Sequence, residues 1–231
     1  MRLVQRRWAD EVLDKLRFHL DTWPSMDYQP LPWLGIHAAR RAKGVESRWS
    51  AIGGALAERD IRTALDLGSN AGYFTIQLAH RGVATVAVEP EPRYSRILRF
   101  AVKRLRLTNV GCLDLDVTPT TASLLPVADA VLFLSVWHHM VRYQGLDGAS
   151  AVLEQVWAKS RQMLFFETGE LEMSARFRLP DMSPEPRRYL EEYLAEHCPG
   201  GKVEHLGLHE AFTPEREPCQ RNLFLVVRDE A

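Results

Sequence analysis

Short apolar runs alternate with segments of helical periodicity through the middle of the chain. The runs predict β-strands over residues 63–67, 83–88, 110–115, 129–135 and 162–167. The segments between them predict helices over residues 71–81, 92–106 and 147–160. Strands that alternate with helices are typical of a parallel sheet with right-handed crossovers, so this region is predicted to be an α/β domain.

The last third of the chain departs from this alternation. Residues 184–198 predict a helix that prolines open and Pro199-Gly200-Gly201 closes. Residues 202–212 and 222–228 follow as two strand patterns without a helix between them, which indicates an antiparallel pair at the sheet edge. Together the patterns predict a mostly parallel seven-stranded sheet with an antiparallel C-terminal edge pair and helices on both faces.

Residues 1–50 are predicted to form an N-terminal helical or lid segment, and residues 51–231 the main domain. Apolar side chains over residues 3–20 have helical spacing with a charged opposite face, so we expect this helix to pack on the domain. The same stretch holds several basic residues: Arg2, Arg6, Arg7 and Lys15. Contact with a membrane surface or a partner helix is therefore the alternative.

Composition narrows the class of protein. Of the 231 residues 46% are hydrophobic, which is enough for the core of one large domain with an accessory segment. Lys and Arg total 29 and Asp and Glu total 30, a balance that argues against a general nucleic-acid binder. The three cysteines show neither zinc-ligand nor disulfide spacing, which favours a reducing cytoplasm and no metal. Because no signal-peptide core and no window of about 20 apolar residues appears, we expect a cytoplasmic protein without a transmembrane segment.

The turn after the first predicted strand is built for close approach to a ligand. In ALDLGSNAGYFTIQLA, residues 64–79, the strand leads into Gly68 and Gly72, and Asn70 between them tolerates a left-handed backbone. Ligands of open parallel sheets bind beyond the carboxyl ends of the strands. The next helix would point its free N–H groups at this turn, so we expect a ligand with an anionic or polar edge.

The spacing of the glycines discriminates between two cofactor classes. A dinucleotide site requires G-x-G-x-x-G, but Asn70 and Tyr73 occupy two of the three glycine positions. The pattern present is Asp66-x-Gly68-x-x-x-Gly72, in which an acid ends the strand. An acid suits a cofactor that has a positive amino-acid end and no diphosphate, such as S-adenosylmethionine (SAM). Glu89, about twenty residues past Gly68, then supplies a carboxylate for the ribose hydroxyls.

These motifs, with Val88-Glu89-Pro90 and the segment 134–139, resemble the class I SAM-dependent methyltransferases, which have a Rossmann-like fold. Asn70 departs from the glycine that is usual in the family. An acid at the end of the third strand would accept the adenine amino group; Asp116 with Val117 is favoured and Asp114 is the alternative. The resemblance implies that the cofactor is bound by Asp66, Gly68, Ser69, Asn70, Gly72, Tyr73, Glu89, Pro90, Asp116, Val117 and Ser135.

Candidate catalytic residues follow the fourth and fifth strands. His138 and His139 would lie at the rim of the substrate pocket, where an imidazole can take a proton from a hydroxyl acceptor. Glu167 ends the fifth strand and could orient a histidine or accept from a sugar hydroxyl. Structural hydrogen bonds for the histidines and a solvated acid for Glu167 are the alternatives, since an anionic acceptor needs no base and methyl transfer depends chiefly on in-line placement.

Candidate substrate-binding residues lie before the domain. Aromatic and basic side chains there would clamp a sugar or a phosphate. The candidates are Trp33, His37, Arg40 and Arg41. A charged helix face is the alternative interpretation.

A narrower resemblance favours a carbohydrate acceptor. Residues 134–170, with the double histidine and the strand that ends on glutamate, are similar to the methyltransferase portion of bacterial kinase–methyltransferases that cap O-antigen chains. That resemblance implies O-methylation of a sugar or sugar phosphate, or of another small molecule. Residues 35–52 are weakly similar to tRNA wobble-uridine carboxymethyltransferases, so a tRNA-modifying enzyme is one alternative, although the charge balance speaks against it. A catalytically inactive scaffold or partner subunit is another alternative. The sequence leaves peripheral membrane contact and the oligomeric state open.

Overall fold

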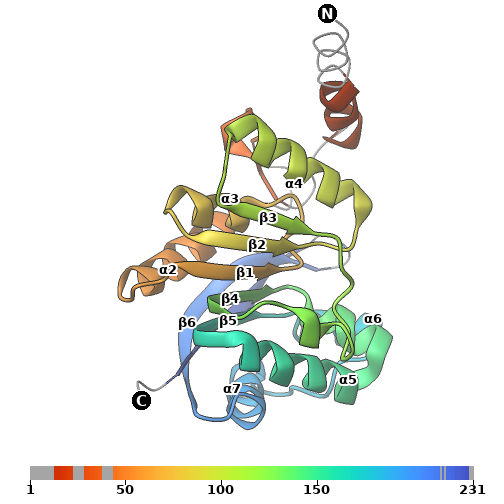
Figure 1. Ribbon diagram of the computed structural model, residues 1–231. Helices are drawn as coiled ribbons and strands as arrows, with labels where there is room; N and C mark the ends of the chain where they lie inside the picture. The colour runs from red at the N-terminus through yellow and green to blue at the C-terminus, as the bar shows by residue number, and fades with distance from the viewer. Residues whose placement is uncertain (1–12, 23–28, 38–43, 214, 216, 229–231) are drawn as a thin grey trace, which may run out of the picture.

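The computed structural model describes residues 13–22, 29–37, 44–213, 215 and 217–228 (Figure 1). Its centre is a seven-stranded sheet in the order β3-β2-β1-β4-β5-β7-β6. The strands are β1 (Thr63–Leu67), β2 (Ala84–Val88), β3 (Val110–Leu113), β4 (Ala128–Leu134), β5 (Ser160–Glu167), β6 (Gly201–Phe212) and β7 (Pro218–Arg228). Strands β1 to β5 are parallel, and β7 runs antiparallel to both β5 and β6. The predicted fold, including the antiparallel edge pair, is confirmed.

Helices cover both faces of the sheet because the central strands are apolar on both sides. Along β4, Val131 and Phe133 pack toward α5 and α7, whereas Leu132 packs toward α2 and α3. The α-helices are α2 (Val45–Ala57), α3 (Tyr73–His80), α4 (Pro92–Leu105), α5 (Trp137–Lys159), α6 (Ser174–Phe177) and α7 (Pro186–His197). The described residues also form the short 3-10 helices η1 (Pro32–Leu34), η2 (Ala122–Leu124) and η3 (Leu171–Met173). None of the helices in the described ranges is long and apolar enough to cross a membrane.

Helix α5 starts well before the predicted residue 147. A non-helical backbone at Gly145 (φ 74°, ψ 171°) separates its first turns from the predicted part. The early turns bury Trp137, Met140 and Val141, whose spacing is that of one helical face. This extension carries both histidines of the double-histidine motif.

The N-terminal part of the chain packs on the edge of the domain. Residues 13–22 are helical and lie against α4, where the rings of Phe18 and Phe100 stack with centroids 4.2 Å apart. For the described part, this is the packing that the sequence predicted. Further along, α2 runs through residue 50, so the predicted division between segment and domain falls inside a helix.

Candidate active site

A cavity of about 720 Å³ opens at the carboxyl ends of β1, β2 and β4. Strand order reverses between β1 and β4, and open parallel sheets bind ligands at such a point. The sequence-selected residues that line it are Gly68, Asn70, Glu89, Pro90, Asp116, Val117, Ser135, His138 and His139. Arg48, one of the basic residues that the sequence places just before the domain, also lines it. Lining residues that the sequence did not single out include Tyr94, Tyr143, Gln144, Arg176, Phe177 and Arg221.

Two glycines fix the turn between β1 and α3. Gly68 has φ 68° and Gly72 has φ 94°, a left-handed region that side chains disfavour. A Cβ at Gly68 would clash with Cγ2 of Val136, and one at Gly72 with Cδ1 of Leu98. Asn70 adopts φ 52°, which asparagine tolerates. The asparagine at the usual glycine position is therefore compatible with this turn.

Two polar atoms of the turn are buried without a hydrogen-bond partner among the described residues. They are Oγ of Ser69 and Oδ1 of Asn70. Buried polar atoms in folded proteins nearly always have a partner, and Asn70 lines the cavity. A bound ligand with a donor group would supply the missing partner for Asn70, whereas Ser69 does not line the cavity.

Glu89 lies at the end of β2 with both carboxylate oxygens held in place. Oε2 accepts from the backbone N–H of Asn70 at 2.8 Å, and Oε1 accepts from that of Glu91 at 2.9 Å. Burial raises the pKa of Glu89, and the backbone donors partly offset this effect. Each oxygen retains further acceptor capacity, so the side chain can receive a pair of vicinal hydroxyls from the cavity.

The sequence led us to expect that the N-terminus of α3 faces a ligand, but its first N–H groups are bound by a side chain of the protein. Oε1 of Gln29 accepts from the backbone N–H groups of Gly72 at 3.1 Å and Tyr73 at 2.9 Å. Gln29 is buried and comes from the N-terminal segment. The side chain of Tyr73 packs on Trp33, with ring centroids 5.6 Å apart, and neither Gly72 nor Tyr73 lines the cavity. Their contribution to the site is the shape of the turn.

Asp66 lies beneath the turn rather than in the main cavity. Its Oδ2 accepts from Oγ1 of Thr75 at 2.5 Å, and burial raises the pKa of Asp66 to about 6. The residue borders a second, smaller cavity together with Gln29 and Arg48. Direct contact of Asp66 with a ligand in the main cavity therefore stays a prediction.

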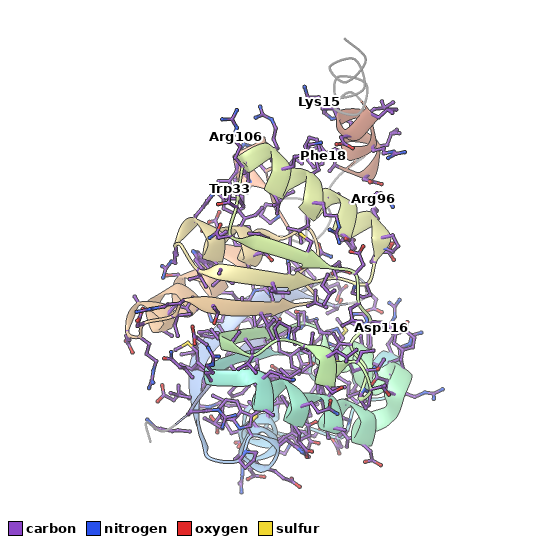
Figure 2. All side chains as sticks on the ribbon, viewed as in Figure 1. Lys15, Phe18, Trp33, Arg96, Arg106 and Asp116 are labelled. Atoms are coloured by element: carbon purple, nitrogen blue, oxygen red, sulfur yellow. The ribbon has the colours of Figure 1, made fainter. Side chains whose placement is uncertain are left out.

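Of the two acids proposed to accept the adenine amino group, Asp116 lies at the cavity and Asp114 does not. Asp114 is tied to Arg99 at 2.9 Å and to Ser95, and it does not line the cavity. Asp116 lines the cavity at the carboxyl ends of the strands (Figure 2). Gln144, which the sequence did not single out, donates to the carbonyl of Val117 at 3.2 Å and keeps a buried Oε1 without a partner among the described residues.

Glu167 is fully buried below the cavity and holds neighbouring polar groups. It accepts from Oγ of Ser135 at 2.6 Å and from Nη1 of Arg48 at 2.9 Å, and Nη1 of Arg221 lies 3.9 Å away. Burial would raise the pKa of Glu167, but the two arginines and the hydrogen bond from Ser135 together outweigh it and lower the pKa. Its hydrogen bonds go to Ser135 and Arg48 rather than to a histidine, so it anchors the wall of the cavity.

The two histidines differ in their hydrogen bonds. Nδ1 of His138 accepts from the backbone N–H of Gly169 at 3.0 Å and lies 3.2 Å from Oγ1 of Thr168. Burial lowers the pKa of His138 well below 6.5, and His139 and Arg221 add to the effect. The ring is therefore neutral, with its proton on Nε2, and Nδ1 is already used.

His139 is an exposed residue at the rim of the cavity. Partial burial lowers its pKa from 6.5, and Arg142, Arg221 and Arg176 lower it further. The centroid of the Phe177 ring lies 5.1 Å from that of His139, which places α6 beside the imidazole. A neutral imidazole at the rim meets the requirements of a proton acceptor better than His138 does.

The predicted substrate residues do not form the wall of this cavity. Trp33 packs on Tyr73 and His80, and His37 is exposed; neither lines it. Arg40 and Arg41 lie outside the described residues. The arginines that do line it are Arg48, Arg176 and Arg221, from α2, α6 and β7.

Solved structures with this architecture include methyltransferases. The bifunctional kinase-methyltransferase WbdD is 18% identical with a TM-score of 0.69, and the match covers 90% of this chain and 44% of that one. Magnesium protoporphyrin IX methyltransferase (ChlM) from Synechocystis PCC 6803, crystallised with SAM, is 14% identical over 80% of this chain and 79% of that one, with a TM-score of 0.57. EvdMO1 is 22% identical with a TM-score of 0.57, covering 78% and 40%.

This chain has the SAM-dependent methyltransferase fold. The Rossmann-like architecture predicted from the turn and the strand pattern is thereby confirmed, and the neighbours include a kinase-methyltransferase, the class that residues 134–170 resemble. The chain spans less than half the length of the WbdD structures that it matches. No protein-family model matches the sequence, and no curated protein matches it either.

Proposed function

We propose that this protein is an SAM-dependent methyltransferase that methylates an oxygen of a small molecule, sugar or sugar phosphate. One observation carries the proposal. A single cavity joins the Gly68 turn and Glu89 at one end to His139 and the arginines Arg176 and Arg221 at the other. A cofactor site and an acceptor site that share one cavity are what methyl transfer requires.

The residues present fit the cofactor. Glu89 would accept the ribose hydroxyls, and Oδ1 of Asn70 would gain the partner it lacks. Asp116, Val117 and Gln144 would hold the adenine, and Ser135 with Gly68 would border the methionine portion. When bound, SAM supplies an electrophilic methyl group.

His139 is the proposed general base for a hydroxyl acceptor. Its lowered pKa keeps the imidazole neutral near pH 7, so a ring nitrogen can take the acceptor's proton as the acceptor oxygen is alkylated. His138 would support this ring from behind, since the two ring centroids lie 4.5 Å apart. Base catalysis of this kind contributes about 10²- to 10⁴-fold in rate.

The choice of a carbohydrate acceptor rests on two likenesses. Residues 134–170 resemble kinase–methyltransferases that act on O-antigen chains, and the architecture matches that of WbdD. Arg176 at the cavity wall would pair with a phosphate or carboxylate on the acceptor. Transfer of labelled methyl from SAM to a panel of neutral sugars, sugar phosphates and tRNA would discriminate between the acceptor classes.

Calorimetry with SAM tests the cofactor assignment. Wild-type protein should bind SAM, and Glu89→Ala should abolish binding because the ribose loses its carboxylate. Glu204→Ala, on the exposed β6 edge, is the control and should leave the affinity unchanged. If wild-type protein gave no heat with SAM but bound a nicotinamide dinucleotide, the proposed function would be wrong.

The reducing cytoplasm proposed as its compartment is consistent with its free cysteines.

A further inference from the structure

We propose that the helix over residues 13–22 docks on an anionic lipid surface, with α4 contributing basic charge behind it. This inference does not depend on the methyltransferase assignment. Its starting point is a ridge of three leucines, Leu13, Leu16 and Leu20, which are 47%, 55% and 66% exposed. We call these three residues the leucine ridge.

The leucine ridge is one face of an amphipathic helix. Its members are spaced by three and four residues, so they lie on one side of the helix. The other side packs on the domain through Phe18, which is 8% exposed and stacks on Phe100. Three large apolar side chains therefore face solvent from a helix that is already seated on α4.

The acidic side chains of this helix are turned away from the leucine ridge. Oδ2 of Asp14 lies 2.6 Å from Nζ of Lys103, and Oδ1 of Asp21 lies 2.9 Å from Nη2 of Arg96. Both aspartates are thus paired with α4. Arg17, which is exposed, follows Leu16 directly and flanks the ridge.

Basic residues dominate the surface formed by this helix and α4, the region labelled by Lys15, Arg96 and Arg106 in Figure 2. Helix α4 with its C-cap has no acidic residue and carries Arg93, Arg96, Arg99, Lys103, Arg104 and Arg106. The whole chain has a formal net charge of −1, so this basic character is local. An apolar ridge flanked by Arg17, on a surface with an excess of basic residues, is the pattern of a helix that lies in the interface of an anionic membrane.

Other occupants fit this surface less well. Nucleic acid would meet the basic residues but leave the leucines in contact with phosphates and water. A second copy docked through the same ridge would bring Arg17 and its basic surroundings against themselves, which is unfavourable. A lipid surface satisfies the leucines and the basic residues at once.

Co-sedimentation of the full chain with vesicles tests the proposal. Wild-type protein should pellet with phosphatidylcholine vesicles that contain phosphatidylglycerol and not with phosphatidylcholine alone, and salt should weaken the binding. The variants L13S/L16S/L20S and R17E should each bind at least about tenfold more weakly. Leu124→Ser and Arg178→Glu, at exposed positions elsewhere, are the matched controls and should bind like wild type.

Because the replaced side chains are exposed, each variant should melt at the wild-type temperature. Thermal melting thus checks that the domain is intact. Absence of wild-type binding to the anionic vesicles, or equal binding to both vesicle types, would overturn the proposal. A wild-type dimer in sedimentation velocity that becomes monomeric in L13S/L16S/L20S would also overturn it, because the ridge would then be a self-association surface. Calorimetry with SAM reads the cofactor site separately, so the two proposals fail independently.

Discussion

At the scale of single residues, the hydrogen bonds of each ring decide which histidine can act in the proposed chemistry. His138 is buried, and its Nδ1 accepts a hydrogen bond from the N–H of Gly169. His139 lies at the cavity rim beside Phe177. The sequence places both in one dipeptide and gives no reason to prefer either. Burial and nearby arginines lower the pKa of His139, so it is the free base at neutral pH.

His139→Ala should lower kcat by about 10²-fold or more while SAM affinity stays unchanged. Because the base acts in its neutral form and its pKa is below 6.5, wild-type kcat should be flat near neutral pH and fall on the acid side of 6.5. The rate–pH profile with a hydroxyl acceptor measures this. An unchanged kcat in the variant would remove His139 from the mechanism.

Gly72→Ala should destabilise the fold, because φ 94° is disfavoured for alanine and the added Cβ meets Leu98. The expected loss in the free energy of unfolding is about 2 kcal/mol or more. Gly54→Ala is the opposite case, since Gly54 lies within α2 with open space around it, and a gain of about 0.5–1 kcal/mol is expected. Urea denaturation measures both; equal effects would contradict the strain at Gly72.

At the scale of elements, the beginning of α3 depends on a segment far away in sequence. Gln29 lies before η1 and caps the two N–H groups that follow the glycine turn. A helix N-terminus leaves such groups unpaired unless a side chain or ligand satisfies them. The N-terminal segment is thus joined to the proposed cofactor site by two hydrogen bonds.

Gln29→Ala should leave the buried N–H of Tyr73 without its acceptor, whereas the N–H of Gly72 keeps its hydrogen bond to the carbonyl of Ser69. The variant should therefore lose about 1–3 kcal/mol of stability and bind SAM more weakly. Gln29→Glu retains an acceptor at the same place and should restore most of both. Gln77→Ala removes an amide that bonds the Tyr73 hydroxyl in the same helix, and it should leave SAM affinity unchanged. Calorimetry and urea denaturation report the two effects; equal SAM affinity in wild type and Gln29→Ala would contradict the coupling.

At the scale of the whole molecule, the sheet gathers charges from distant parts of the chain. Arg48 on α2, Glu167 on β5 and Arg221 on β7 form one buried group, and its two arginines line the cavity. An isolated buried charge is strongly unfavourable, so the group is stable only when all its members are present. Arg176, on the short helix α6, lines the proposed acceptor end of the same cavity.

The sequence by itself determined the sheet, the turn and most of the proposed cofactor site. Apolar periodicity is a local property, so β1 matches its predicted residues 63–67 and β4 differs by one residue at each end. The glycines at 68 and 72 and the acid at 89 are likewise tied to strand ends that the pattern locates. Glu89 and Asp116 lie at these strand ends and line the cavity, and their contact with the cofactor stays a prediction.

Only the tertiary structure decided which side chains line the proposed acceptor end of the cavity. Arg48, Gln144, Arg176 and Arg221 come from separate elements, and no periodicity marks a side chain that reaches a cavity from a short or distant segment. Trp33 looked like a substrate residue because it lies near arginines in sequence, yet packing on Tyr73 turns it elsewhere. Local spacing fixes which elements form, whereas long-range packing fixes which of their side chains meet.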